Sequence, residues 1–372
     1  MQNSLNVGVW IIATGVIIAL LYLGRDILAP FALAVFLFLV MEGFARSIGK
    51  RAPLLDGLWA RLVSIALVLT GFTFFLALFA RGIAQFGAQA LDYETKINEL
   101  IADVYSYIQL EGAPTLADLV VNDSVQPVFR GIASGMQSLT GDLILINIYI
   151  VFLFLAASAW PSKLDRVFPD PERREQVSNV GDAARRGIET YLLAQTVISA
   201  LITVLTYLTL IVLGVENALF LSALIFVLNY IPTIGSIIAA ALPPLFALVQ
   251  PSVAAWIPGD APQNSYVFAA LVFVGVSLWQ FAIGNFVQPR IMSDTLNLSS
   301  LVVLLGLAIW GAIWGIPGMF LSAPLTVLMM ILFAQAPSTR WIAILLSANG
   351  DPMIADGASR SDVGVTAQPV LE

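Results

Sequence analysis

The stretch 213-LGVENALFLSALIFVLNYIPTIGSIIAAALPPLFALVQP-251 decides the architecture of this chain. Nearly every residue in it is apolar, but the segment NYIPTIGS at positions 229–236 interrupts the apolar run. Proline has no backbone donor and clashes with the preceding turn, and glycine loosens the chain. Each apolar arm is shorter than the roughly 20 residues that a bilayer span needs. We therefore expect a re-entrant helical hairpin over residues 215–251, although two full crossings would also return the chain to its starting side.

The break in this hairpin predicts a polar path through the membrane. Irregular backbone persists at membrane depth only where protein buries it or where it lines a water-filled cavity, and transporters build substrate sites from such broken helices. Amides and hydroxyls both donate and accept, so they suit a small, neutral, polar solute. They can equally hydrogen-bond one helix to another. The candidate path residues are Asn229, Pro232, Thr233, Gly235 and Ser236 in the break, Pro243 and Pro244, which we expect to break the returning arm, and Gln195, Gln280, Asn285 and Gln288 nearby.

Composition places the chain among membrane proteins. It has 372 residues, of which 59% are hydrophobic and 11% charged, whereas soluble proteins carry about 25% charged residues. The expected fold is an all-α, polytopic transmembrane bundle in contact with the lipid bilayer. The net charge of −7 argues against a nucleic-acid partner. Because the chain has no cysteine and no histidine, thiolate and HExxH metal sites are excluded, and we expect no metal, no cofactor and no catalytic residue.

The apolar runs predict about eight spans. They cover residues 5–23, 27–41, 62–80, 142–160, 188–213, 266–283, 300–315 and 319–335. The predicted organisation is a first transmembrane region (1–80), an extracytoplasmic insert (81–140), a transmembrane core with the hairpin (141–340), and a tail (341–372) whose polar composition indicates disorder. If the N-terminus lies inside, most of the 17 Lys and Arg residues face the cytoplasm, so both termini are expected there.

The polar insert carries an amphipathic pattern. Apolar residues alternate spacings of three and four, which is typical of a heptad seam on a helix. The seam is Ile83, Phe86, Ala90, Tyr93, Ile97, Leu100, Val104 and Tyr107. A second helix is expected to pack back on it through Val125, Val128, Ile132, Met136 and Leu139. The seam therefore serves either the packing of the insert on itself or contact between neighbouring subunits.

Two further segments flank the hairpin, 187-GIETYLLAQTVISALITVLTYLTLIVLGVENAL-219 and 286-FVQPRIMSDTLNLSSLVVLLGLAIWGAIWGIPGMFLSAPLTVLMMILF-333. Together with the hairpin, they resemble the AI-2 exporter (AI-2E) family of bacterial permease-like proteins over most of residues 20–337. The matching motifs are the Leu-Gly turn (Leu213, Gly214), N-Y-I-P-x-x-G (229–235), the Q-P connector (Gln288, Pro289), G-x-x-G-x-x-L-x-x-P (Gly315, Gly318, Leu321, Pro324) and I-L-x-P-F (27–31). As a set these motifs are specific, although each alone is weak.

The resemblance implies an exporter of the bacterial cytoplasmic (inner) membrane, with autoinducer-2 as the substrate of some members. It also implies a homo-oligomer, a pentamer by analogy. Other members resemble monovalent cation/proton antiporters, which require a titratable group in the membrane. Here Glu189 and Glu216 are the candidates for ion coupling, and Glu216 departs from the proline that is common in the family. A non-transporting membrane scaffold that binds a partner through the insert is the third alternative.

Overall fold

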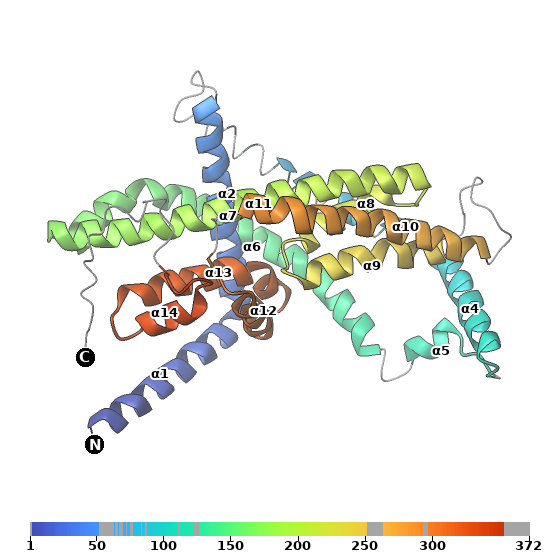
Figure 1. Cartoon of the computed structure of the whole chain (residues 1–372), viewed down its shortest axis with the longest axis horizontal. Helices are drawn as coiled ribbons and strands as arrows, with labels where there is room; N and C mark the ends of the chain where they lie inside the picture. The colour runs from blue at the N-terminus through green and yellow to red at the C-terminus, as the bar shows by residue number, and fades with distance from the viewer. Residues whose placement is uncertain are drawn as a thin grey trace, which may run out of the picture.

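The computed structural model of the chain describes residues 2–51, 88–110, 112–121, 126–250, 263–292 and 297–352, together with scattered residues between 63 and 85. Within these ranges the regular structure is helical, apart from one isolated bridge between Leu298 and Ser347 (Figure 1). The helices are α1 (Gln2–Leu23), α2 (Arg25–Arg51), α4 (Ala90–Tyr107), α5 (Leu116–Val121), α6 (Gln126–Val167), α7 (Pro171–Leu213), α8 (Ala218–Leu228), α9 (Ile234–Val249), α10 (Gln263–Ala282), η1 (Ile283–Val287), α11 (Gln288–Met292), α12 (Ser300–Trp314), α13 (Ile316–Gln335) and α14 (Arg340–Leu346). The prediction of an all-α fold is confirmed.

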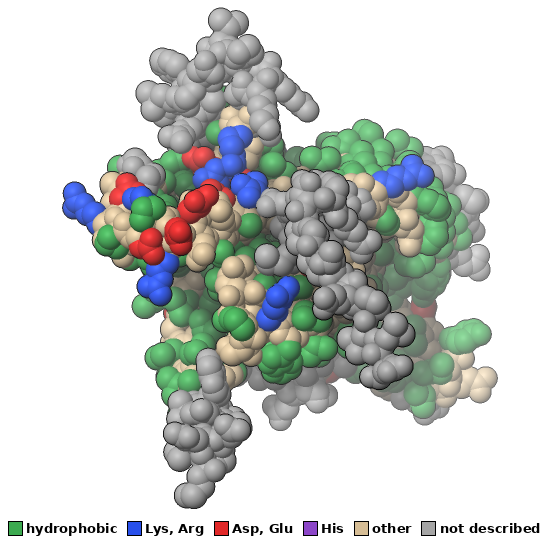
Figure 2. Space-filling view, turned by 60° about the vertical axis from the view of Figure 1, so that its left-hand side comes forward, with side chains coloured by type: hydrophobic (Ala, Val, Ile, Leu, Met, Phe, Trp, Pro, Cys, Tyr) green, Lys and Arg blue, Asp and Glu red, His purple; other side chains and the backbone are tan. Residues whose placement is uncertain are grey.

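The surface agrees with a membrane environment. Large apolar side chains are exposed on several helices, among them Ile12, Leu155 and Val212. Figure 2 shows hydrophobic side chains over much of the visible face, while charged ones gather mainly in one patch. Soluble monomers rarely expose contiguous apolar surface of more than a few hundred Å². These side chains therefore mark surface that faces lipid.

Four helical stretches in the described part of the chain are long and apolar enough to cross a bilayer. They are Arg25–Arg46, Pro171–Leu213, Ser265–Met292 and Ile316–Gln335. Several other apolar helices are shorter, including Leu145–Ala157 and Ser300–Trp314. The expected span over 62–80 lies mostly outside the described residues. Eight spans therefore stays a prediction.

Helix α7 is the long axis on which the other elements are arranged (Figure 1). It begins with Asp170 as N-cap, whose carboxylate accepts from the Glu172 N–H at 3.2 Å, followed by Pro171 at the first helical position. It ends at Gly214, which adopts a left-handed φ of 80°. The sequence predicts a start near residue 188, so the structure adds more than four turns to the expected helix.

Two apolar centres flank α7. The first, which we call the hairpin core, is built from α7, α8, α9 and α10 and includes Ile202, Ile225 and Phe268. The second, which we call the aromatic core, joins α2, α7, α12 and α13 around Phe36 and Trp310. The tip of the α8–α9 hairpin lies where the two centres meet, because Ile225 belongs to the first and Tyr230 to the second.

The structure differs from the sequence predictions in two peripheral segments. Residues 126–167 form one continuous helix, α6, which includes both the second insert helix and the span expected from residue 142. In Figure 1, α4 and the start of α6 diverge and are joined by α5, so α6 does not pack back along α4. At the other end, α14 packs on α13 where disorder was expected, and residues 353–372 lie outside the described part of the chain.

Candidate functional site

The break predicted from Pro232 and Gly235 separates α8 from α9. Helix α8 ends at Leu228 and α9 begins at Ile234. Between them Thr233 has a φ of 62°, a conformation that a β-branched residue rarely adopts. Such backbone strain persists only where surrounding contacts impose it, and it is common at ligand sites. The hairpin therefore has a rigid, irregular tip instead of a continuous rod.

Close packing of the backbone at this tip explains the glycine. A Cβ placed on Gly235 would lie 1.7 Å from the carbonyl oxygen of Leu228. The Gly235 N–H donates to the Ile231 carbonyl at 3.0 Å, while the Ile231 N–H donates to the Leu228 carbonyl at 2.8 Å. The start of α9 thus packs directly against the end of α8, which any larger residue at position 235 would prevent.

Three amide side chains predicted for the path come together at the break, and we call them the amide node (Gln195, Asn229 and Gln280). The Gln195 Nε2 donates to the Asn229 carbonyl at 2.6 Å, and the Gln280 Nε2 donates to the Asn229 Oδ1 at 3.3 Å. In an unbroken helix the N–H of residue 233 would occupy that carbonyl. Gln195 of α7 therefore supplies the backbone hydrogen bond that the break removes, and Gln280 of α10 binds the Asn229 side chain.

One donor of the node has no partner. The Asn229 Nδ2 is a buried nitrogen without a hydrogen-bond acceptor among the described residues. A buried amide donor without a partner costs about 1–3 kcal/mol, and such groups mark sites of strain, bound water or ligand. The node thus presents an unused donor at the centre of an apolar bundle.

Aromatic contacts hold the other side of the tip. The Tyr230 hydroxyl lies 2.6 Å from the Thr196 Oγ1, and its ring stacks on Phe320 with centroids 4.7 Å apart. Phe36 and Phe226 approach the same ring edge-on. Sequence reasoning did not identify Tyr230 or Thr196. The available signal was the position of Tyr230 inside the break.

The remaining predicted path residues do not reach the node. The Ser236 Oγ donates to the Thr233 carbonyl at 2.8 Å, and the Asn285 Nδ2 donates to the Phe281 carbonyl at 2.9 Å. The Gln288 Nε2 points to the Met292 sulfur at 3.6 Å. Each of these contacts stays within its own segment. Their role in a path stays a prediction.

The expectation that Pro243 and Pro244 break the returning arm is wrong. Both lie inside α9, which runs without interruption from Ile234 to Val249, and both are buried. A proline inside a helix removes a backbone bond, but neighbouring helices can compensate in a membrane bundle. Packing of α9 against α10 therefore keeps this arm helical.

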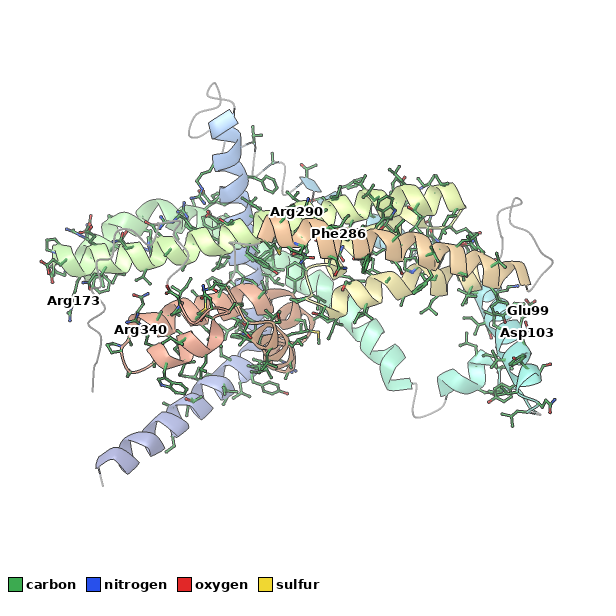
Figure 3. The ribbon with its side chains drawn as sticks, in the orientation of Figure 1. Glu99, Asp103, Arg173, Phe286, Arg290 and Arg340 are labelled. Atoms are coloured by element: carbon green, nitrogen blue, oxygen red, sulfur yellow. The ribbon has the colours of Figure 1, made fainter. Side chains whose placement is uncertain are left out.

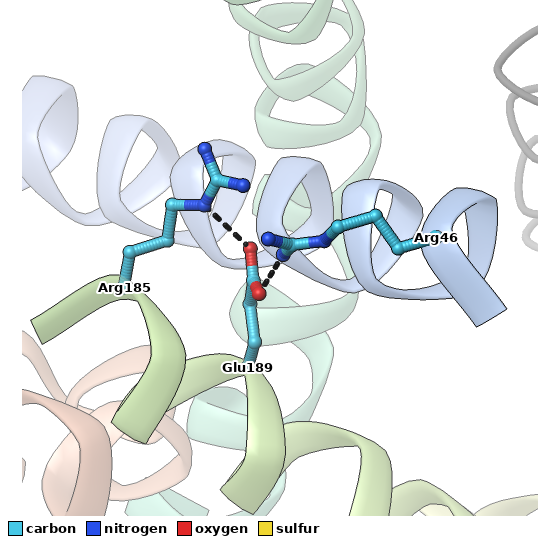
Figure 4. Close-up of polar contacts among 3 residues, drawn as sticks. All are labelled: Arg46, Arg185 and Glu189. Atoms are coloured by element: carbon cyan, nitrogen blue, oxygen red, sulfur yellow. Dashed lines mark hydrogen bonds and ion pairs between the residues drawn. The ribbon is translucent and has the colours of Figure 1, made fainter. Parts of the chain in front are cut away.

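The candidate carboxylate Glu189 sits in an ion-pair cluster, which we call the arginine clamp (Figure 4). Its side chain is 7% exposed and pairs with Arg46 of α2 and with the Arg185 Nε, the latter at 3.1 Å. Gly43 packs beside Leu193 at the same crossing of α2 and α7. Glu189 therefore joins α2 and α7 where the two helices cross.

The second candidate carboxylate, Glu216, borders an open cleft of about 300 Å³. Gln85, Ala88, Gln89 and Asn217 complete its lining. The Glu216 N–H donates to the buried Gln250 Oε1 at 3.1 Å, which fixes the turn between α7 and α8. The cleft lies between the insert and this turn.

Tyr93 docks the insert beside this cleft. Its ring meets Phe246 of α9 edge-on at 5.6 Å, and its hydroxyl donates to the Gln89 Oε1 at 2.6 Å. Burial, together with the nearby Glu216 carboxylate, raises the pKa of Tyr93 to about 12. The apolar seam of the insert therefore contacts α9 at Tyr93, a partner that the sequence predictions did not include, whereas Tyr107 at the far end of α4 is exposed.

These features define a helical membrane protein in which buried amides hold a broken hairpin, an architecture typical of transporters. The profile of the AI-2E family transporters matches residues 11–338, and the chain belongs to that family. It is 25% identical over 355 residues to the AI-2 transport protein TqsA of Escherichia coli K12, covering 93% of this chain and 96% of the relative. A putative transport protein of Haemophilus influenzae is 27% identical over 357 residues, covering 93% and 98% of the two chains. The resemblance inferred from the motifs is confirmed.

Proposed function

We propose that this protein exports a small, neutral, polar solute across the bacterial cytoplasmic membrane through the broken α8–α9 hairpin. Its family consists of transporters, and autoinducer-2 is the first solute to test, because the relative in Escherichia coli is named an AI-2 transport protein. The observation that carries the proposal is the amide node, where three helices place uncharged donors and acceptors around one break.

The chemistry of the node favours a neutral solute. Amide groups carry no net charge and offer both donors and acceptors, so they can replace the water around hydroxyl and carbonyl groups. The unpartnered Asn229 Nδ2 supplies a donor that a guest can accept. Gln195 and Gln280 hold Asn229 in place, so binding requires little further ordering of the site.

The distribution of charge supports an orientation for this path. Figure 3 shows Arg173 and Arg340 at one end of the long axis and Glu99 and Asp103 at the other. Basic residues favour the cytoplasmic side, so we place both termini there and the insert outside. Helix α8, with 11 residues, is about 16 Å long, which brings the hairpin tip to about half the depth of a ~30 Å core. We also carry over the homo-oligomer implied by the family, five copies by analogy.

The test is solute efflux from proteoliposomes. Gln195→Leu and Asn229→Leu should each lower the autoinducer-2 efflux rate at least about tenfold, because each removes a hydrogen bond of roughly 1.4 kcal/mol or more at the node. Gln335→Leu is the matched control, since Gln335 is exposed and its amide donates to the Ile331 carbonyl of its own helix at 3.3 Å. Wild-type protein that moves no autoinducer-2, or node variants with unchanged rates, would contradict the proposal.

Cation/proton exchange is a second candidate, and Glu216 at the cleft is the observation that favours it. The carboxylate lies beside the amides of Gln85 and Gln89 at the proposed outer end of the path. If this carboxylate carries the coupled proton, Glu216→Gln should abolish sodium-driven proton flux in vesicles. Flux at the wild-type rate in that variant would remove this candidate.

A further inference from the structure

Beyond the amide node, buried hydroxyl groups without partners occur on the same three helices. The Thr203 and Thr206 hydroxyls of α7, the Ser222 hydroxyl of α8 and the Ser277 hydroxyl of α10 have no hydrogen-bond partner among the described residues. Thr206 is 0% exposed and Ser222 is 1% exposed. Buried polar groups in native proteins are nearly always bonded, so a set of this size needs an explanation.

Helical spacing places three of these hydroxyls, those of Thr206, Ser222 and Ser277, near the faces that carry the node, whereas Thr203, eight residues after Gln195, lies about 80° away around α7. Thr206 lies 11 residues, or about three turns, after Gln195, and Ser222 lies about two turns before Asn229. Ser277 precedes Gln280 by one turn. Each helix that contributes an amide therefore presents an unused hydroxyl on the same side, farther along its length.

The antiparallel register of α7 and α8 brings two of these hydroxyls to similar depth. The Gln195–Asn229 bond fixes one end of the pair, and the turn at residues 214–217 fixes the other. Both helices rise by about 1.5 Å per residue, so residues equally far from a fixed end lie at the same depth. Counting from the Gln195–Asn229 bond puts Ser222 level with residue 202 of α7, and counting from the turn puts it level with residue 209, so Thr206 lies within this range. Ser199, whose hydroxyl accepts from Gln195 at 3.4 Å, links this segment to the node.

The absence of charged side chains among these hydroxyls determines which class of solute can bind there. In the part of the chain that the structure describes, the one buried charged residue, Glu189, lies 17 residues, about 25 Å, from Thr206 along α7, and Glu216 lies six residues before Ser222, at the outer turn. A cation bound among these hydroxyls would therefore have no carboxylate on the same turn of any of these helices to balance its charge in an apolar core. A neutral molecule that bears hydroxyl and carbonyl groups can satisfy them without that cost.

We propose that Thr206, Ser222 and Ser277 form a second binding station for a neutral, hydroxyl-bearing solute, between the amide node and the outer turn of the hairpin. The proposal rests on the proposed transport function and assigns its route to the interior of the α7–α8–α10 bundle. The solute passes from amides to hydroxyls over a length of about 16 Å, the rise from Gln195 to Thr206.

The first experiment needs no transport assay and uses the fact that the chain contains no cysteine. Ser222→Cys and Ser322→Cys are matched, because both serines are 1% exposed but the Ser322 hydroxyl is bonded to the Met319 carbonyl at 2.8 Å. We expect a water-soluble methanethiosulfonate to label Ser222→Cys at least about tenfold faster, and autoinducer-2 to slow that labelling. Equal labelling rates would overturn the proposal.

The second experiment separates a station from packing. Thr206→Val keeps the shape and removes the hydroxyl, so we expect an unchanged or higher unfolding temperature together with at least a fivefold lower efflux rate. Thr326→Val is the control, because that buried hydroxyl donates to the Ser322 carbonyl at 2.6 Å, and its loss should lower stability but not efflux. Efflux at the wild-type rate in Thr206→Val, while Gln195→Leu is impaired, overturns the station but leaves the proposed function intact. No efflux from wild-type protein overturns the function itself, and the labelling comparison still decides whether the hydroxyls bind a solute.

Discussion

The arginine clamp allows a quantitative test of whether Glu189 is a structural group or a proton carrier. Glu189→Gln keeps the shape of the side chain and removes its charge, which leaves Arg46 and Arg185 facing each other. Removing one member of a fully buried ion pair costs about 3–5 kcal/mol, whereas exposed pairs are worth up to about 1 kcal/mol. The two arginine side chains are 40% and 43% exposed, so each pair falls between these limits. We therefore expect Glu189→Gln to lower the free energy of unfolding by about 1–1.5 kcal/mol for each pair, and by about 2–3 kcal/mol in all.

The assay is unfolding of the purified protein in detergent, followed by tryptophan fluorescence. The matched control is Glu175→Gln, an exposed carboxylate on the same helix, which should change stability by less than about 0.5 kcal/mol. A double-mutant cycle with Arg46→Met isolates one pair. We expect a coupling of at least about 1 kcal/mol, because residues in contact rarely contribute additively.

If Glu189→Gln unfolds at the wild-type temperature but loses proton-coupled flux, Glu189 acts as a titrating group and not as a link between α2 and α7. If stability falls and flux per folded molecule is retained, the clamp is structural and Glu189 is removed from the candidates for ion coupling.

Gly235→Ala forces the tip open, because the added Cβ would lie 1.7 Å from the Leu228 carbonyl oxygen. We expect thermal unfolding to show a loss of at least about 2 kcal/mol in the free energy of unfolding. The control Gly187→Ala, whose added Cβ would meet nothing within 4 Å, should be neutral or stabilising. The pKa of Tyr93 is raised to about 12, so its contribution to folding stability is complete below its ordinary pKa near 10 and is lost as the pH rises through about 12. A titration followed by tyrosinate absorbance should show one group fewer near pH 12 in Tyr93→Phe than in the wild type. Trp314→Phe removes the bond from the Trp314 Nε1 to the Leu21 carbonyl at 3.1 Å and should cost about 1 kcal/mol in the same unfolding assay, with no change contradicting the anchoring of α1 by α12.

The centre of the hairpin is predictable from sequence because its local chemistry has few alternatives. Proline and glycine disfavour a regular helix, and Pro232 close to Gly235 predicted the break that is observed at residues 229–233, whereas Pro243 and Pro244 are accommodated inside α9. Gln195 and Gln280 were identified because a polar amide inside an apolar helix needs a partner. Which partner each one has could not be predicted, because that depends on how α7 and α10 rotate about their axes.

The sequence predictions were wrong where charge or proline was taken as the end of a helix. The basic segment before residue 188 belongs to α7, and the combination of Asp170 and Pro171 was an available N-terminal signal. The pair Pro243 and Pro244 lies inside α9, since tertiary packing overrides local propensity there. The position of Tyr230 inside the break was a signal, but an aromatic residue in an apolar run does not indicate which hydroxyl it contacts, so its partner Thr196 was not predicted.

The π-helical turn η1 at Ile283–Val287 changes the phase of everything that follows it in the chain. Eight residues separate Gln280 from Gln288, which in a regular helix at 100° per residue would set their side chains about 80° apart. A π-turn accommodates one extra residue, so only seven residues count toward the regular helical rotation. The side chains of Gln280 and Gln288 therefore point in directions about 20° apart around the helix axis. Without the π-turn, the same eight residues would place the Gln288 amide about 80° away from the Gln280 amide around the helix axis.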